Sequence, residues 1–244
     1  MIRKPSIVAV VPAAGFGTRM NSAQPKQYLK IGHKTIIEHT LDKLLTCEAI
    51  SRVIVAVSAK DPIFASLTVA QDSRVQQVIG GDNRADSVLA GLNYVADDEW
   101  ALVHDAARPC ITHEDIHKLI DQVFAVGRGG ILAMPIFDTV KLASAAHQQV
   151  IDKTLDRNYL WAAATPQLFT ASELKASLTK ALTEHANITD EASAIEYCGG
   201  HPLLVLGRRD NLKVTRPEDL ALATFYLAQQ QIITLPTDKD KECE

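Results

Sequence analysis

Short, mostly apolar segments rich in β-branched residues recur along the first half of the chain. They are Ile7–Val11, Val53–Val57, Val75–Ile79, Ala101–His104 and Ile131–Met134. Apolar residues that follow one another without strict alternation are typical of strands buried on both faces of a parallel sheet. These segments therefore predict the strands of one mostly parallel sheet.

Helical signals lie between these segments and after them. Apolar residues within 85–95 fall on one face at helical spacing. Capping boxes are predicted at Thr35 with Glu38, Thr170 with Glu173, and Thr215 with Glu218. Later elements are predicted as helices at Ser172–Glu184, Asp190–Tyr197 and Pro217–Gln230, with a strand at Leu203–Leu206. This order predicts the α/β class, with a doubly wound, mostly parallel, Rossmann-like sheet.

The regular alternation stops between Ile136 and Asn158. Two short mixed segments, Thr139–Ala143 and Val150–Thr154, flank a polar link there, which predicts a β-hairpin arm projecting from the body. An isolated hairpin is marginal in water, so we expect the arm to pack against a second copy in a homodimer. We expect one domain over residues 1–236, with the arm at 136–158 and a charged, disordered tail at 237–244.

The composition limits the kinds of molecule that the protein is expected to bind. The chain has 244 residues and a formal net charge of -4 at pH 7. This slightly acidic balance argues against a nucleic-acid partner, which would require a basic face. The four cysteines are widely spaced and form no C-x-x-C pair, so the sequence favours neither a zinc site nor a disulfide framework.

The N-terminus resembles a secretory signal, because Arg3 and Lys4 precede an apolar run. That run is short, Pro12 interrupts it, and no A-x-A cleavage pattern follows, so we interpret it as a buried first strand. No run approaches the roughly 20 apolar residues of a membrane span. We expect a cytoplasmic protein without a membrane partner.

The loop after the predicted first strand has features of a phosphate-binding loop. It reads P-A-A-G-F-G-T-R-M over 12–20 and is followed by P-K-Q at 25–27. Glycines let backbone N–H groups approach phosphates, and loops at this edge of α/β sheets bind ligands. The Walker pattern is absent, and Met20 stands where a dinucleotide loop needs its third glycine. Arg19 and Lys26 add two cations; the alternative is a tight turn with two solvated charges.

Two further loops end predicted strands. G-G-D-N-R over 80–84 opens a helix, where free N–H groups could bind a ligand or Asp82 could simply cap the helix. H-D-A-A-R-P over 104–109 places Asp105 where a Mg²⁺ ligand is expected and Arg108 where an anionic substrate could bind. A buried Asp–Arg pair closing a turn is the alternative. We interpret His104 as an ordinary strand-end residue and assign it no role.

A series of motifs follows in a fixed order over Ile7 to about Gln230. It consists of G-F-G-T-R-M, P-K-Q, G-G-D-N-R-x-x-S, H-D-A-A-R-P, D-T-V-K, D-R-N-x-L-W-x-x-x-T-P-Q, T-D-E-A and N-L-K-V-T-R-P-E-D-L. Together the motifs resemble the 2-C-methyl-D-erythritol 4-phosphate cytidylyltransferase family of the non-mevalonate isoprenoid pathway. G-x-G-x-R alone is shared with many sugar nucleotidyltransferases, whereas H-D-A-A-R-P and the final motif are more specific. The chain ends soon afterwards, so we expect no fused cyclodiphosphate synthase.

The resemblance implies roles for particular residues. Those expected to hold the co-substrate CTP are Ala13, Ala14, Gly15, Gly81, Asp82, Ser87 and Asp105, the last also at Mg²⁺. Those expected to neutralise charge during catalysis are Arg19, Lys26 and Lys213. Those expected to serve methylerythritol phosphate or the reaction centre are Arg108, Thr139, Arg157, Thr165 and Thr189. The resemblance implies no role for Phe137.

The implied reaction is attack by a phosphate oxygen of methylerythritol phosphate on the α-phosphorus of CTP, with release of pyrophosphate. A phosphate monoester is mostly dianionic at neutral pH, since its second pKa is about 6, and needs no general base. Catalysis should then rest on positioning and electrostatics. The alternatives are a ribitol 5-phosphate cytidylyltransferase on the same fold, and a non-catalytic nucleotide-binding regulator, which would have no use for Arg19, Lys26 and Lys213 together.

Overall fold

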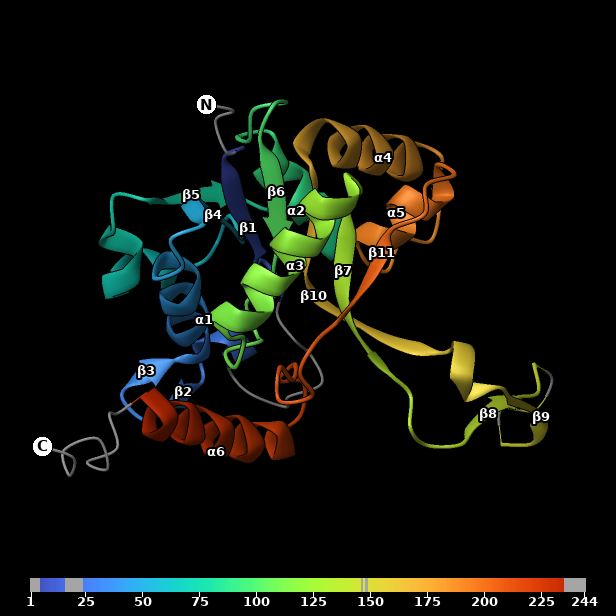
Figure 1. Ribbon diagram of the computed structural model, residues 1–244. Helices are drawn as coiled ribbons and strands as arrows, with labels where there is room; N and C mark the ends of the chain where they lie inside the picture. Colours follow the sequence, from blue (N-terminus) through green and yellow to red (C-terminus); the bar gives the residue numbers. More distant parts are fainter. Residues whose placement is uncertain (1–4, 16–23, 146, 148, 235–244) are drawn as a thin grey trace, which may run out of the picture.

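One sheet organises the body of the molecule (Figure 1). The computed structural model describes residues 5–15, 24–145, 147 and 149–234. The sheet has seven strands in the order β11-β7-β10-β6-β1-β4-β5. Their bounds are β1 Ile7–Pro12, β4 Ile50–Val57, β5 Val75–Ile79, β6 Trp100–Val103, β7 Gly130–Pro135, β10 Trp161–Thr170 and β11 Leu203–Leu206. All neighbouring pairs are parallel except those of β10, which runs antiparallel to β6 and β7.

Both faces of the sheet are covered by helices. Ile7, Ala9 and Val11 of β1 belong to one buried cluster, and Val8 and Val10 belong to another. The first cluster includes apolar residues of α1 (Ile36–Leu45) and α3 (His113–Val126). The second includes those of α2 (Arg84–Leu92), α4 (Ala171–Thr183) and α5 (Glu191–Tyr197). The predicted doubly wound, mostly parallel sheet is therefore confirmed.

Two features of the sheet differ from the prediction. β5 is an edge strand, and Gln76, Gln77 and Ile79 are exposed, so this segment is not buried on both faces. β10 was not predicted, because its first half is rich in alanine and Pro166 interrupts a central strand. The pairing of β10 with β7 shifts register between Ala163 and Gln167, which accommodates the proline.

The predicted helix caps have different outcomes. The capping box of Thr35 and Glu38 is present in full at the start of α1. At α4 the Thr170 side chain accepts from the N–H of Glu173. The box of Thr215 with Glu218 is wrong, because the carboxylate of Asp219 binds the Thr215 and Arg216 N–H groups instead. Helix α6 (Pro217–Thr234) begins two residues after Thr215, which places Asp219 rather than Glu218 at the third helical position.

A third buried cluster fixes α6 beside the sheet edge. Val214, at 0% exposure, packs there with Ile31, Ala107 and Leu227. Ile31 belongs to the small hairpin of β2 (Lys30–Ile31) and β3 (Lys34–Thr35), which follows the short helix η2 (Lys26–Tyr28). The chain between β11 and α6, which carries Lys213, is thereby held against the loop after β6.

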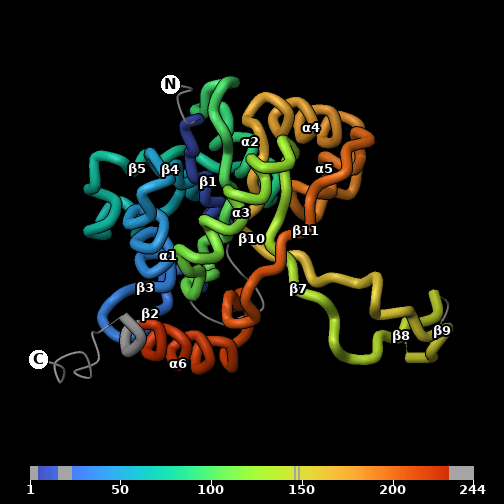
Figure 2. Tube along the Cα trace, viewed as in Figure 1, coloured from blue at the N-terminus to red at the C-terminus, as the bar shows by residue number. Residues whose placement is uncertain are grey.

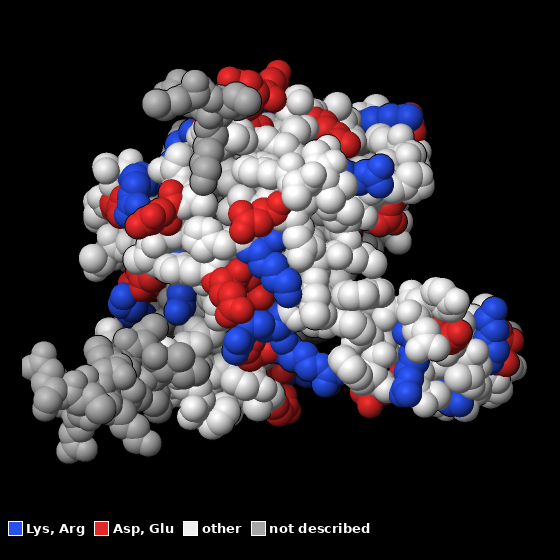
Figure 3. All heavy atoms as spheres, viewed as in Figure 1, with Lys and Arg blue, Asp and Glu red and all other residues white. Residues whose placement is uncertain are grey.

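The predicted arm is present. β8 (Val140–Ala143) and β9 (Ile151–Leu155) pair antiparallel in a sheet of their own, followed by the short helix η5 (Arg157–Tyr159). The arm stands off from the body in Figures 2 and 3, and most of its residues are exposed. The remaining short helices are η3 (Phe64–Ser66) and η4 (Thr68–Gln71). The tail expected at 237–244 lies outside the described residues. Within the described part of the chain, none of the helices has the length and apolar character needed to cross a membrane.

Candidate active site

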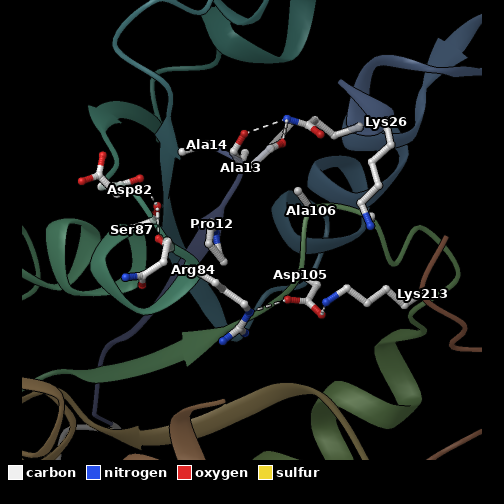
Figure 4. A pocket seen from close by; sticks show the side chains of 15 residues that line it. Pro12, Ala13, Ala14, Lys26, Asp82, Arg84, Ser87, Asp105, Ala106 and Lys213 are labelled. Atoms are coloured by element: carbon white, nitrogen blue, oxygen red, sulfur yellow. Dashed lines mark hydrogen bonds and ion pairs between the residues drawn. The ribbon is translucent and has the colours of Figure 1, made fainter. Parts of the chain in front are cut away.

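The loops that follow β1, β5 and β6 meet at one edge of the sheet. They enclose a pocket of about 270 Å³, which Figure 4 shows from close by. The predicted residues that line it are Ala13, Ala14, Gly15, Lys26, Gly81, Asp82, Ser87, Asp105 and Lys213. Arg19 lies outside the described residues. The structure thus brings together all the described residues that were predicted to hold the nucleotide or to act in catalysis.

Close packing between two loops shapes one wall of this pocket. A Cβ atom at Gly80 would lie 2.8 Å from Ala14 Cβ and 2.8 Å from Ser87 Oγ. A Cβ atom at Gly81 would overlap the side chain of Asp86. Glycine is therefore needed at both positions for steric reasons. The result is a wall made of backbone, against which a flat or phosphorylated ligand can lie closely.

A buried glutamine holds the first loop in place. Gln27 Nε2 donates to Ala13 O at 2.7 Å and to Gly15 O at 3.2 Å. Gln27 is 3% exposed, so these hydrogen bonds are largely shielded from water. Its place in the P-K-Q motif did not reveal this role.

The start of α2 packs directly behind Gly80 and Gly81 and belongs to the same side of the pocket. Asn83 caps the helix by accepting from the N–H of Asp86 at 3.0 Å, so the suggested cap role of Asp82 is wrong. Asp82 is exposed at the pocket. Ser87 Oγ donates to Asn83 O at 2.9 Å, so its hydroxyl hydrogen is already used within the protein. Its oxygen can still accept a hydrogen bond.

Asp105 is the centre of a buried charge cluster. Its carboxylate lies 2.9 Å from Arg84 Nε, 2.9 Å from Lys213 Nζ and 3.4 Å from Arg108 Nε. Arg84 also forms a bidentate pair with Glu191, at 2.7 and 3.0 Å. Three cations therefore face two carboxylates, which gives the cluster an excess of positive charge.

The cluster sets the protonation of its members. Burial alone would raise the pKa of Asp105, but the charges of Arg84, Lys213 and Arg108 hold it well below its usual range. Burial would lower the pKa of Arg84, but Glu191 and Asp105 raise it instead. Burial lowers the pKa of Arg108. Asp105 is thus a permanent carboxylate and cannot act as a general acid at neutral pH.

A second pocket of about 210 Å³ adjoins the first. Both are lined by Arg84, Asp105 and Lys213. The second also contains Arg108, Thr165 and Thr189, three of the residues predicted to serve the second substrate. The two pockets therefore form one bipartite site, with the charge cluster at their junction.

The positions of Lys26 and Lys213 depend on each other through Val214. Lys26 Nζ donates to Val214 O at 2.8 Å, and Val214 N donates to Ala107 O at 2.8 Å. Figure 4 shows both lysines on the side of the pocket opposite Asp82. Both cations are thus fixed beside the junction by backbone contacts of a buried residue.

The remaining predicted residues lie on the arm. Thr139 and Arg157 are exposed, and the Arg157 guanidinium donates to the carbonyl of Phe137. Arg209 stacks over the Phe137 ring, with its guanidinium carbon 4.0 Å from the ring centroid. In the described part of the chain, neither Thr139 nor Arg157 lines the two pockets.

Sequence reasoning missed Arg84 and Glu191. Arg84 stands directly after G-G-D-N, where a cation at a helix start was an available signal. Glu191 stands in the T-D-E-A motif, but the motif assigned it no role, because an acid in the first turn of a helix is accounted for by the helix dipole alone. Only the fold shows that Glu191 is 1% exposed and paired with Arg84.

Comparison with known proteins assigns this site to a family. Residues 7–229 match the family model described as 2-C-methyl-D-erythritol 4-phosphate cytidylyltransferase. The protein of that name from Pectobacterium atrosepticum is 54% identical over 232 residues, covering 93% of this chain and 97% of its own. The one from Yersinia pseudotuberculosis is 55% identical over 227 residues, covering 93% and 94%. The crystal structure of the Francisella tularensis enzyme of that name has a TM-score of 0.78 at 32% identity, covering 91% of this chain and 99% of its own. The chain therefore belongs to the 2-C-methyl-D-erythritol 4-phosphate cytidylyltransferase family.

Proposed function

We propose that this protein transfers a cytidylyl group from CTP to 2-C-methyl-D-erythritol 4-phosphate and releases pyrophosphate. The observation that carries the proposal is the bipartite site, in which two pockets share Arg84, Asp105 and Lys213. A transferase needs two substrates to meet at one point. The family and the names of the relatives support methylerythritol phosphate over ribitol 5-phosphate as the acceptor.

The first pocket suits the nucleotide. Its backbone wall at Ala13–Gly15 and Gly81 offers close approach to a base and to phosphates. Ser87 Oγ and the neighbouring carbonyl groups are acceptors, which matches the amino group of cytosine better than O4 of uracil. Arg19 lies outside the described residues; because it follows Gly15 closely in the sequence, we propose that it acts on the triphosphate with Lys26.

The second pocket suits a phosphate monoester. Arg108 lines it, with Nε bound to Asp105 and Nη1 to Asn211 O, and Lys213 lies at the junction with the first pocket. The attacking phosphate is mostly dianionic at neutral pH, because its second pKa is about 6, so no base is required. The ring of His104 is fully buried and is therefore not placed to take a proton from a substrate.

Rate acceleration would come from charge that is already in place. The α-phosphoryl group gains negative charge in the transition state, and it would lie where Lys26 and Lys213 are held by the Val214 segment. Preorganised cations in a partly buried site need little reorganisation during the reaction. Asp105 keeps Arg84 and Lys213 from repelling each other before the substrates bind.

We propose that Mg²⁺ binds together with CTP. In the described residues no group of three or more His, Cys, Asp or Glu side chains could hold a metal on its own. Mg²⁺ commonly uses one or two carboxylates plus substrate phosphates, so Asp105 with a triphosphate is a suitable donor set. Both Asp105 oxygens contact cations, which disfavours Mg²⁺ until the triphosphate arrives. The ion would neutralise phosphate charge.

We also propose that the arm completes the site of a second copy. The arm carries Thr139 and Arg157 away from the pockets of its own chain, and it exposes Val150, Ile151 and Tyr159 at 55%, 60% and 83%. Exposed apolar side chains on a two-stranded hairpin favour packing against another protein surface. In a closed two-fold dimer each arm would serve the partner's body.

The cysteines support a cytoplasmic location. Cys47 and Cys110 are free thiols within the core, and burial raises the pKa of Cys110 to about 12. Buried free thiols are typical of proteins that work in a reducing compartment. We therefore propose the cytoplasm as the location of the protein.

A substrate panel tests the proposed function. Pyrophosphate release is measured with CTP or UTP and with methylerythritol phosphate or ribitol 5-phosphate. We expect kcat/KM for CTP to exceed that for UTP by roughly tenfold or more, because a buried acceptor left unpaired costs ~1–3 kcal/mol. Equal rates with both nucleotides would contradict the assignment of the base pocket. A preference for ribitol 5-phosphate would contradict the assignment of the acceptor.

A further inference from the structure

His104 is a buried titratable residue that the proposed mechanism does not use. It directly follows β6, is 0% exposed, and stands between that strand and the active residues Asp105 and Arg108. Its ring lies 3.1 Å (Nδ1) from Thr165 Oγ1 and 3.2 Å (Nε2) from Arg108 O. Both ring nitrogens are therefore engaged with residues that line the second pocket.

The partners of the ring fix its tautomer. A backbone carbonyl can only accept, so Nε2 must carry the hydrogen and donate to Arg108 O. In a neutral ring Nδ1 is then an acceptor, and the Thr165 hydroxyl donates to it. The same hydroxyl oxygen accepts from the N–H of Asp105 at 3.0 Å. A continuous chain of hydrogen bonds thus runs from the Asp105 backbone through Thr165 and His104 to the Arg108 backbone.

The hydrogen-bond partners of the ring fit its neutral form. The ring is fully buried, and its Nδ1 atom faces the Thr165 hydroxyl, whose oxygen already accepts from the N–H of Asp105. A protonated ring would direct a second N–H at that oxygen and would reverse the hydrogen bond. The geometry of these groups therefore supports the neutral ring.

We propose that His104 is a positioning residue for the transfer reaction. Through Thr165 it orients Asp105, to which Lys213 and Arg84 are bound, and through the carbonyl of Arg108 it orients the arginine of the second pocket. This inference rests on the proposed function. It also revises the part expected of Thr165, whose hydroxyl hydrogen is used on His104, so that Thr165 can offer a substrate only a lone pair.

Two amide variants separate the two connections. In His104→Gln the amide can still donate near Arg108 O, but the acceptor for Thr165 is lost. In His104→Asn the amide oxygen can accept from Thr165, but the donor to Arg108 O is lost. We expect His104→Gln to lower kcat about tenfold, and His104→Asn to raise KM for the polyol phosphate about tenfold with a smaller change in kcat, as loss of one buried hydrogen bond allows.

A double-mutant cycle tests whether the effect passes through Thr165. In a Thr165→Val background, His104→Gln should cost no further kcat, because the hydroxyl that it orients is already absent. Val205→Ala is a control that weakens the core at β11 without touching this chain of hydrogen bonds, and its kcat per folded enzyme should be unchanged. Folded fractions are measured by denaturant titration for every variant.

A spectroscopic readout separates this inference from the proposed function. Nitrogen-15 NMR of the wild-type ring should show the neutral Nε2–H tautomer at pH 7, whether or not the enzyme turns over the expected substrates. The opposite tautomer or a charged ring would overturn the inference. Folded His104 variants with wild-type kcat and KM, or effects additive with Thr165→Val, would overturn it as well. An inactive wild type would overturn the proposed function alone.

Discussion

The site at the sheet edge and the arm differ in burial and in the number of groups that hold their side chains in place. At the sheet edge Asp105 is 6% exposed and contacts three cations, and neighbouring backbone groups are tied by Gln27 and Val214. In the arm β8 and β9 pair mainly with each other, and most of their side chains face solvent. Charge is thus preorganised in the body, whereas the strands of the arm mainly contact each other. Under our proposal, chemistry depends on the body and completion of the site depends on assembly.

The substitution Asp105→Asn should have the largest effect on the preorganised charge of the body. The change leaves Arg84, Lys213 and Arg108 facing one another without their shared carboxylate. Removing one partner of a buried ion cluster costs about 3–5 kcal/mol, so we expect that loss in the free energy of unfolding and no measurable turnover. The control is Asp97→Asn, since Asp97 pairs with Lys175 but its side chain is 75% exposed. That variant should lose less than about 1 kcal/mol. Equal losses would contradict the buried cluster.

Substitutions of Lys26 test whether a positive charge held by the body accelerates the reaction. Lys26→Ala should lower kcat by ~10²–10³, as loss of a donor to developing charge commonly does, and Lys213→Ala should behave similarly. Lys26→Gln keeps a donor for Val214 O without the charge, so it should remain nearly as slow. The exposed Lys30→Ala is the control. A change confined to KM for CTP would show that Lys26 binds the ground state only, and recovery in Lys26→Gln would show a purely structural role.

Acid sensitivity tests the buried, neutral ring of His104 in the body. The pKa of His104 is lowered to about 4, below its ordinary value of 6.5, so the unfolded chain takes up the proton first. His104 therefore contributes stability that is present above pH ~6.5 and is lost as the pH falls toward 4. Between pH 7 and 5 this loss is about 2 kcal/mol. Urea titrations of the wild type and His104→Asn should show a smaller pH dependence in the variant; parallel curves would refute the buried neutral ring.

The arm is tested by complementation between two inactive variants. Lys26→Ala and Arg157→Ala are unfolded and refolded together, so that half of the dimers are mixed. If Arg157 acts in the partner's site, each mixed dimer has one intact site, and about a quarter of wild-type activity should return. Each variant refolded alone is the control. A mixture shown to contain mixed dimers that stays inactive would reject the exchange of arms.

The sequence predicted the parts of the molecule that have a local signal. Runs such as Ile7–Val11 and Val53–Val57 identified the central strands, and the glycine loops identified the edge where ligands bind. The sequence did not predict β10, because Pro166 and a run of alanines lack a strand pattern. The strand nevertheless occupies a central position in the sheet. Arg84 and Glu191 escaped because their pairing joins residues 107 positions apart. Such contacts follow from the topology of the sheet and not from any local pattern.

The central claim is that a phosphate oxygen of the polyol phosphate attacks the α-phosphorus of CTP. It is tested most directly with methylerythritol phosphate whose non-bridging phosphate oxygens are oxygen-18, followed by phosphorus NMR of the products. We predict one label in the bridge of the new diphosphate, which shifts both of its phosphorus signals, and no label in pyrophosphate. Oxygen-18 in pyrophosphate, or a cytidylyl phosphorus without a labelled bridge, would contradict the account.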